Sequence, residues 1–313
     1  MDSARVRILD GSLPETDRDP TKPPVPGRNR HDLPRKSPAR SRLTGTRLAV
    51  CHGMTTLRQL RRRTVALLPP FIRTRLKKTR DFATLRIAPV AYRGTGRLCP
   101  VCETPSRRFA RFGAEPRDDA LCVHCRSLER HRLLWLFVTR RTDLFDGRPK
   151  TMLHVAPEPC LEPRFRASLG DGYLTADLTD PRAMLKMDVT DIAFPDESFD
   201  VIYCSHVLEH VADDRRALRE FHRVLRRDGW AILLVPVCAE RTFEDPSIVD
   251  PEERLRVFGQ EDHVRNYGPD YVDRLRDAGF KVQVTRIDDL VARPDALLMG
   301  LTPDSGEIYY CKR

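Results

Sequence analysis

The stretch FDVIYCSHVLEHV, residues 199–211, joins a mostly apolar run to a short polar segment that contains two histidines. Residues 199–204 have the length and composition of a buried strand. Residues 214–226 are expected to form a helix. Its apolar residues lie on one face: Ala217, Leu218, Phe221, Val224 and Leu225. Asp228 and Gly229 are expected to end this helix before a second apolar run at 230–237. The succession of strand, helix and strand indicates a parallel sheet covered by helices.

The same alternation extends over residues 150–313. Strands are expected at 151–156, 173–176, 185–189, 199–204, 230–237, 280–285 and 308–312, and helices at 161–169, 214–226 and 270–278. The segment 288–307 shows no clear helix, so the last two strands are expected to pair antiparallel. The predicted fold class is α/β: a Rossmann-like seven-stranded, mostly parallel sheet with helices on both faces, preceded by a small zinc-ribbon-like module.

That module, residues 98–141, contains two C-x2-C pairs, Cys99 with Cys102 and Cys122 with Cys125. The spacing is typical of a four-thiolate Zn²⁺ site, in which the closed coordination sphere makes the metal structural. A redox dithiol pair and coincidence are the alternatives. Arginines and phenylalanines lie between the pairs and either bind nucleic acid or build the core of the module. Residues 127–141 are expected to form a helix that joins the module to the sheet.

The positive charge lies near the N-terminus. Residues 1–98 carry 23 Lys and Arg against 7 Asp and Glu, whereas residues 99–313 carry 32 against 38. Residues 1–53 have the composition of a disordered, Pro-rich segment, although Met54 could also be the true start. Residues 54–97 form a basic amphipathic segment. Its part 54–80 suits peripheral contact with an anionic membrane or with nucleic acid, or simply a solvated basic helix.

The chain contains no apolar stretch near the roughly 20 residues that span a bilayer. It begins without the features of a secretory signal, and its nine cysteines are an odd number. These features favour a reducing compartment, and we expect a cytoplasmic protein.

Residues 199–237, with their HVLEHV motif, resemble the class I S-adenosylmethionine-dependent methyltransferases, and in particular the broad type 11-like group. The resemblance implies S-adenosyl-L-methionine as cofactor, bound outside the carboxyl ends of the parallel strands. The turn after the first strand is usually glycine-rich in that family, but here Ala156, Glu158 and Cys160 stand where glycines are expected. Glu158 could instead meet the ammonium group of the cofactor.

The other cofactor-binding candidates follow from the same resemblance. Asp177 ends the second strand, where a carboxylate accepts hydrogen bonds from ribose hydroxyls, although a simple turn aspartate is the alternative. Asp188 resembles the acidic residue beside the adenine, with Val189 packed on the ring. The remaining candidates lie at the ends of the first and fourth strands: Val155, Ala156, Ser205 and His206.

Two histidines are candidates for catalysis. His206 follows the fourth strand and either removes a proton from the acceptor or only lines the cofactor pocket. His263 lies in the polar segment 258–268, together with Tyr267, and could bind the acceptor unless that segment is a solvated loop. His206 and His210 are four residues apart with Glu209 between them, but a metal site is not expected there, because no third ligand can be identified and the family resemblance accounts for the run without metal.

Three functions follow. The leading hypothesis is a methyltransferase for a small-molecule, sugar or biosynthetic-intermediate acceptor. The first alternative is an RNA methyltransferase that uses the zinc module to hold RNA. The second is a non-catalytic, zinc-containing binding protein with a degenerate methyltransferase domain, suggested by the missing glycines.

Overall fold

The structure is a computed structural model that describes residues 88–113 and 116–313. The expectations for residues 1–53 and for 54–80 lie outside these residues. All described residues fall in a single compact unit of the chain. Within them, no helix is long and apolar enough to cross a membrane.

Seven strands form the main sheet, in the order β12-β13-β9-β8-β5-β6-β7. They are β5 (Met152–Val155), β6 (Tyr173–Asp177), β7 (Leu185–Lys186), β8 (Phe199–Ser205), β9 (Leu225–Leu234), β12 (Lys281–Thr285) and β13 (Ile308–Lys312). The pairs from β7 to β9 are parallel, whereas β13 is antiparallel to both β9 and β12. The Rossmann-like, mostly parallel sheet and its antiparallel last pair are therefore confirmed.

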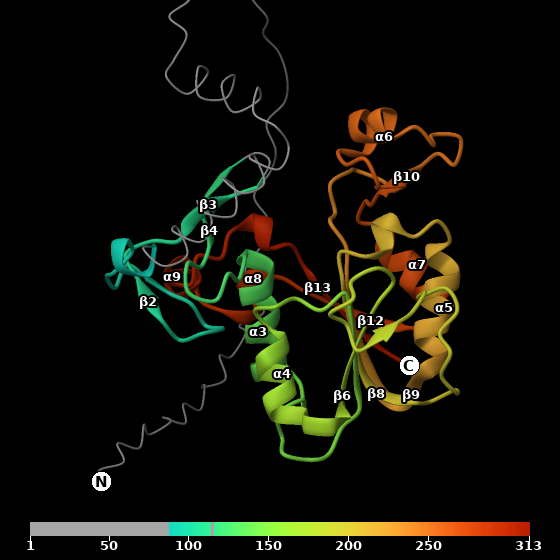
Figure 1. The fold of residues 1–313 in the computed structure, drawn as a ribbon, viewed down its shortest axis with the longest axis horizontal. Coiled ribbons are helices and arrows are strands. Elements are labelled where there is room, and N and C mark those ends of the chain that lie inside the picture. The colour runs from blue at the N-terminus through green and yellow to red at the C-terminus, as the bar shows by residue number, and fades with distance from the viewer. Residues whose placement is uncertain (1–87, 114–115) are drawn as a thin grey trace, which may run out of the picture. The chain divides into compact units, whose positions relative to one another are not determined.

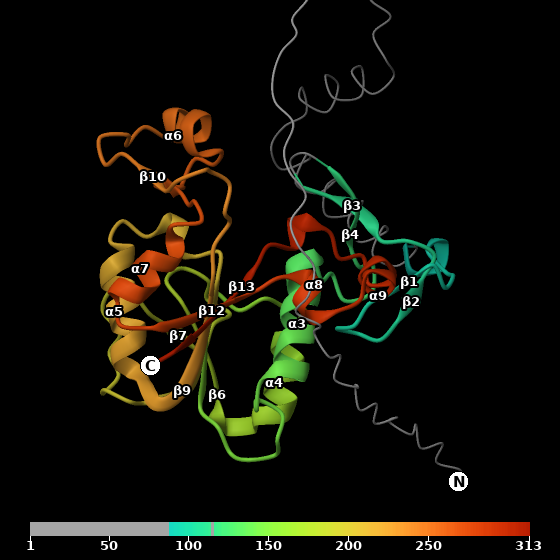
Figure 2. The ribbon, with the colours of Figure 1, turned by 180° about the vertical axis from the view of Figure 1, so that it is seen from behind.

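Helices cover both faces of this sheet (Figure 1; Figure 2). On one face lie α3 (Glu129–Arg141) and α4 (Glu162–Leu169), and on the other α5 (Asp214–Val224) and α7 (Tyr271–Asp277). Apolar side chains buried between these layers form the core; Phe165 of α4 and Phe221 of α5 are both at most 1% exposed. Burial of such aromatic side chains contributes much of the stability of the packed layers.

The helix after β8 ends earlier than predicted. It stops at Val224, and β9 begins at Leu225, so Asp228 and Gly229 lie inside the strand and do not end the helix. Gly229 permits this extension, because a Cβ there would lie 2.7 Å from the Asp200 carbonyl oxygen. Arg226 also fixes the new strand start by donating to Asp200 Oδ1 at 2.6 Å.

The expectation that 288–307 lacks a helix is wrong. This segment contains most of α8 (Ile287–Leu290), α9 (Arg293–Leu298) and the 3-10 turn η3 (Pro303–Ser305). These elements are too short to show a helical period in the sequence. The strand predicted at 185–189 is also shorter, since Asp188 accepts a hydrogen bond from the Thr190 backbone and turns the chain.

The remaining elements are small. Two antiparallel pairs, β1 (Arg97–Leu98) with β2 (Pro105–Ser106) and β3 (Ala110–Phe112) with β4 (Arg117–Leu121), carry the cysteines. Past β9 come β10 (Phe243–Glu244), α6 (Pro251–Phe258) and β11 (Arg265–Asn266), and β10 pairs with β11. The 3-10 turns η1 (Gly170–Gly172) and η2 (Leu208–His210) precede β6 and α5.

Candidate functional site

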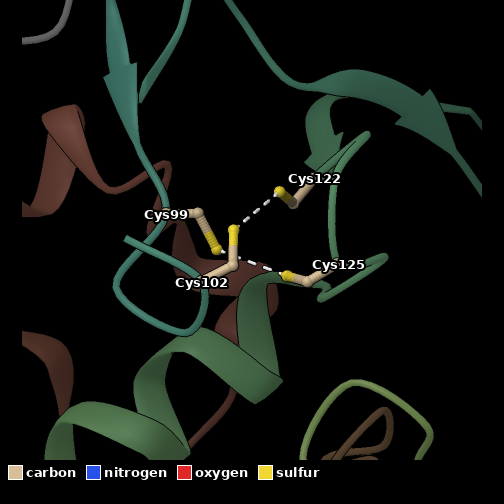
Figure 3. Close-up of side chains that lie close together, drawn as sticks. All are labelled: Cys99, Cys102, Cys122 and Cys125. Carbon is tan, nitrogen blue, oxygen red and sulfur yellow. Dashed lines mark hydrogen bonds between the residues drawn. The ribbon is translucent and has the colours of Figure 1, made fainter. Parts of the chain in front are cut away.

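The four cysteines of the two C-x2-C pairs converge (Figure 3). The Sγ atoms of Cys99 and Cys125 lie 3.6 Å apart, those of Cys102 and Cys122 lie 3.8 Å apart, and all four lie within 4.8 Å of one another. A tetrahedral zinc site with Zn–S bonds of 2.3 Å places sulfurs about 3.8 Å apart. The geometry of the four thiols therefore fits a single Zn²⁺ ion.

Both pairs adopt the same backbone turn. The residue after the second cysteine donates its N–H to the carbonyl of the first, Glu103 to Cys99 at 2.7 Å and Arg126 to Cys122 at 2.9 Å. Both residues have left-handed backbones, with φ of 55° and 67°. This repeated turn aims the sulfurs of each pair toward the same point, as metal-binding knuckles do.

The chemistry of the thiols agrees with this geometry. Hydrogen bonding from Cys122 lowers the pKa of the Cys102 thiol, whereas hydrogen bonding to Cys102 raises the pKa of Cys125. The Ser127 hydroxyl lies 3.2 Å from the sulfurs of both Cys99 and Cys125. Such outer contacts orient metal ligands. The lowered pKa of Cys102 favours its thiolate, the ionised form that binds metal.

Arg132 of α3 ties the cysteine module to the C-terminal segment. Its fully buried guanidinium donates to the carbonyls of Ala120, Ser127 and Gly300 at 2.8–3.0 Å and lies over the Phe109 ring at 4.3 Å. Phe109 is thus a core residue, as the alternative to nucleic-acid stacking predicts, while Phe112 is 42% exposed. The cysteine module therefore packs against the sheet domain through α3 and Gly300.

The order of the strands reverses between β5 and β8, which is where ligands bind in open α/β sheets. Ala156 follows β5 and His206 follows β8. Each continues the sheet through one backbone hydrogen bond. The Ala156 N–H donates to the Ala176 carbonyl, and the His206 N–H donates to the Leu234 carbonyl. Each then turns with a left-handed φ, 50° and 55°, which costs energy for residues other than glycine. Strained backbone at the ends of two neighbouring strands is often found at functional sites.

Glu158 is held inside the first turn. Its side chain is 13% exposed, and its carboxylate contacts His154 Nε2 at 2.7 Å and the Tyr203 hydroxyl at 3.0 Å. Burial by itself raises the pKa of Glu158, but the hydrogen bond and charge of His154 outweigh it, and the pKa falls to about 2. The turn that lacks glycines is therefore braced by an ionised carboxylate.

Asp177 ends β6 and forms a turn. Its Oδ1 accepts hydrogen bonds from the N–H groups of Thr179 and Asp180, both at 2.7 Å. Its Oδ2 accepts none from the described part of the chain. Asp177 therefore stabilises the turn through Oδ1 and keeps Oδ2 without a partner among the described residues. Asp188 is exposed beyond β7, and Val189 beside it is buried.

Ser205 and His206 stand at the end of β8. Ser205 is buried, and its Oγ lacks a hydrogen-bond partner within the described ranges. His206 is one-third exposed, and its Nδ1 lies 3.3 Å from Oε1 of Glu209 in η2. Val155, the last residue of β5, is buried.

His263 lies close to this part of the chain, although 52 residues separate it from Val211. The Val264 N–H donates to the Glu209 carbonyl at 2.9 Å, and the Arg265 guanidinium donates to the carbonyls of Leu208, Val211 and Ala212. As a result His263 meets His210 edge-on, with ring centroids 4.6 Å apart. Burial lowers the pKa of His263, and the nearby His210 lowers it further, which favours the neutral imidazole.

Tyr267 is not available to an acceptor. It is fully buried, and its hydroxyl donates to Asp214 Oδ2 at 2.6 Å. Arg274 pairs with the same carboxylate at 2.9 Å and with Glu244 at 2.8 Å. Residues 263–267 are therefore a packed part of the core and not a solvated loop.

A separate groove of 780 Å³ lies beside the cysteine module. Its walls combine α3, α4 and the second C-x2-C pair, and its lining includes Cys125, Trp135, Phe145, Cys160 and Arg164. Neither Asp177 nor His206 lines it. No local sequence pattern indicates this groove, because its walls come from three separate segments.

One family model matches part of the main sheet. Residues 171–233, from just before β6 almost to the end of β9, match a family model described as a methyltransferase domain. One curated relative, described as an uncharacterized methyltransferase YcgJ of Bacillus subtilis, is 40% identical over 74 residues. That alignment covers 24% of this chain and 28% of the relative, so the chain spans less than a third of the relative's length.

Solved structures with similar folds include three methyltransferases. The YcgJ protein of Bacillus subtilis aligns with 58% of this chain and 94% of its own, at 16% identity and a TM-score of 0.36. An S-adenosylmethionine-dependent methyltransferase of Archaeoglobus fulgidus aligns with 59% and 94%, at 13% identity and 0.37. A Burkholderia thailandensis N1-methyltransferase, solved with 1,6-didemethyltoxoflavin and S-adenosylhomocysteine, aligns with 55% and 74%, at 16% identity and 0.35.

Proposed function

We propose that this chain is an S-adenosylmethionine-dependent methyltransferase that acts on a small molecule, such as a sugar or another biosynthetic intermediate. The observation that carries the proposal is the methyltransferase match over residues 171–233, which takes in the strands on both sides of β5. The crevice at the carboxyl ends of these strands is the expected cofactor site.

The free oxygen of Asp177 suits the hydroxyls of the cofactor ribose, because a carboxylate accepts two adjacent donors. Ala156 keeps the left-handed backbone that a glycine would adopt, so the turn can still approach the cofactor closely. Glu158 lies in the same turn with a partly exposed carboxylate that suits the ammonium group. Val189 would pack beside the adenine, with Asp188 at its edge.

Methyl transfer is an in-line displacement in which positioning supplies much of the rate. His206 lies at the crevice with one-third of its side chain exposed, so it is the candidate base for an acceptor that must lose a proton. Glu209, 3.3 Å from His206, would orient the imidazole and stabilise its protonated form. Ser205 Oγ is free to bind the cofactor or the acceptor.

The four cysteines are proposed to hold one structural Zn²⁺. Their spacing fits a tetrahedral site, and four thiolates leave no position for a substrate. The metal would hold the two knuckles together and so position α3, which follows the second pair directly.

Calorimetry of the full chain with S-adenosylhomocysteine tests the cofactor assignment, because this product keeps the ribose and the amino-acid group. Binding of one molecule per chain is expected. Failure to bind would overturn the proposal and favour a non-catalytic binding protein. Incubation of a cell extract with labelled S-adenosylmethionine then identifies the acceptor: label that passes a dialysis membrane indicates a small molecule, whereas retained, ribonuclease-sensitive label indicates RNA.

A further inference from the structure

Glu209, His210 and His263 bring one carboxylate and two imidazoles together next to His206. One ligand atom from each lies within 4.8 Å of the others. Glu209 and His210 belong to η2, and His263 comes from the segment before β11. A distant part of the chain therefore supplies His263 as a third ligand beside Glu209 and His210.

Two of these groups are buried with unmet polar atoms. Glu209 is 1% exposed and His263 is 6% exposed. Glu209 Oε2 and His263 Nε2 find no hydrogen-bond partner in residues 88–113 and 116–313. A buried carboxylate oxygen without a partner is costly, so such atoms usually face a ligand or an ion.

The nearby arginines do not neutralise Glu209. Arg265 directs its guanidinium to backbone carbonyls and pairs with Glu244 at 2.8 Å, with Asp214 at 3.8 Å. Arg274 pairs with the same two carboxylates. Among residues 88–113 and 116–313, Glu209 contacts a titratable group through the 3.3 Å approach of its Oε1 to Nδ1 of His206, so an added cation would be strongly favoured.

The ligands are also held in place. Val264 fixes His263 to the backbone of Glu209 at 2.9 Å. His210 Nδ1 contacts Asp262 Oδ2 at 3.2 Å, so a cation would bind at Nε2 if this contact is kept. A carboxylate on the second ring nitrogen is the usual support of a metal-binding histidine.

We propose that Glu209, His210 and His263 bind a divalent transition-metal cation beside the methyl-transfer crevice. One carboxylate and two imidazoles suit Zn²⁺, Fe²⁺, Co²⁺ or Ni²⁺, and three protein ligands leave positions open for water or a substrate oxygen. The site is distinct from the closed four-cysteine cluster. If the proposed methyltransferase function holds, the cation binds an oxygen of the acceptor and increases its acidity, next to His206.

Calorimetry with Zn²⁺ tests the site, using full-length protein that already carries its structural zinc. Wild type is expected to bind one additional Zn²⁺ per chain. Glu209→Gln and His263→Asn should each weaken this binding by at least about tenfold. His222→Gln, which removes an imidazole packed on Phe280 away from the site, should leave it unchanged. His210→Asn, at a one-third exposed position, provides the test if a buried variant fails to fold.

Absence of a further Zn²⁺ in wild type would overturn the proposal, as would equal affinity in the ligand variants and in His222→Gln. Binding of S-adenosylhomocysteine is measured on the same samples. If the protein binds S-adenosylhomocysteine but no second Zn²⁺, only the proposed metal site is contradicted. If it binds the second Zn²⁺ but no S-adenosylhomocysteine, the methyltransferase function is contradicted and the metal site stands.

Discussion

Nε2 of His154 lies 2.7 Å from Oε2 of Glu158, and this contact joins the centre of the sheet to the turn that follows β5. The Tyr173 hydroxyl contacts the other ring nitrogen of His154 at 2.6 Å, and the Tyr203 hydroxyl donates to Glu158 at 3.0 Å. A chain of polar groups thus crosses three neighbouring strands beneath the proposed cofactor site. In such networks each buried group depends on its partners.

Glu158→Gln should reduce stability in a pH-dependent way. The folded-state pKa of Glu158 is about 2, below the usual value of about 4.3. A depressed carboxyl pKa stabilises the folded state above pH 4.3, and this contribution is lost as the pH falls through 2. Urea unfolding should show wild type losing roughly 2 kcal/mol between pH 6 and 3 that Glu158→Gln does not lose.

The matched control for Glu158 is Glu162→Gln, which makes the same charge change on α4, where the carboxylate pairs with Arg166 at the surface. Its stability should follow the wild-type pH curve. Parallel curves for Glu158→Gln and wild type would contradict the proposed ionisation of Glu158.

Asp177→Asn should weaken the binding of S-adenosylhomocysteine by about ten- to a hundredfold, because a charged hydrogen-bond acceptor is lost. Asparagine keeps an Oδ1 for the N–H groups of Thr179 and Asp180, so the melting temperature should change little. Calorimetry measures the affinity. Asp180→Asn, which loses only a surface pair with Arg182, is the control. Unchanged affinity in Asp177→Asn would place the ribose elsewhere.

Cys122→Ser should abolish the tightly bound zinc, which we expect at about one per chain after dialysis, because a tetrahedral site needs four ligands. It should also lower the melting temperature, since metal binding contributes directly to folding. Cys238→Ser, at an exposed position outside the cluster, should keep both values. Metal analysis that finds no zinc in wild type would argue against the site.

Gly300→Ala should destabilise the protein by about 1 to 3 kcal/mol, because an added Cβ would lie 2.8 Å from the Phe109 ring and the backbone is left-handed, with φ of 61°. Gly306→Ala shares the left-handed backbone, with φ of 72°, but meets nothing within 4 Å. Urea unfolding should show the greater loss for Gly300→Ala. Equal losses would mean that the contact with Phe109 does not matter.

The sequence was enough to predict the sheet, because most of its strands are local runs of apolar or alternating apolar and polar residues. It did not predict the start of β9 at Leu225, which depends on contacts of Arg226 and Gly229 with Asp200, more than 20 residues earlier. The helices α8 and α9 were not predicted for a similar reason: they are short, and they depend on packing against residues distant in the sequence.

The candidate site was only partly predictable. The four cysteines follow a local spacing and could be found directly. The neighbourhood of His263 and Glu209 depends on one backbone hydrogen bond from Val264 and on the contacts of Arg265 with η2, which no local pattern encodes. Glu158 was expected to face the cofactor, but its bonds to His154 and Tyr203 appear only once β5 and β8 lie side by side.

The position of β13 between β9 and β12 constrains how the chain reaches its native state. Residues 308–312 are synthesised after the other six strands of this sheet, yet they fill an interior place in it. Until they arrive, β9 keeps an unpaired edge and β12 has no neighbour to pair with. Gly300 and Phe109 meet at the same late stage, so the cysteine module, although made early, waits for the C-terminal segment before its packing is complete.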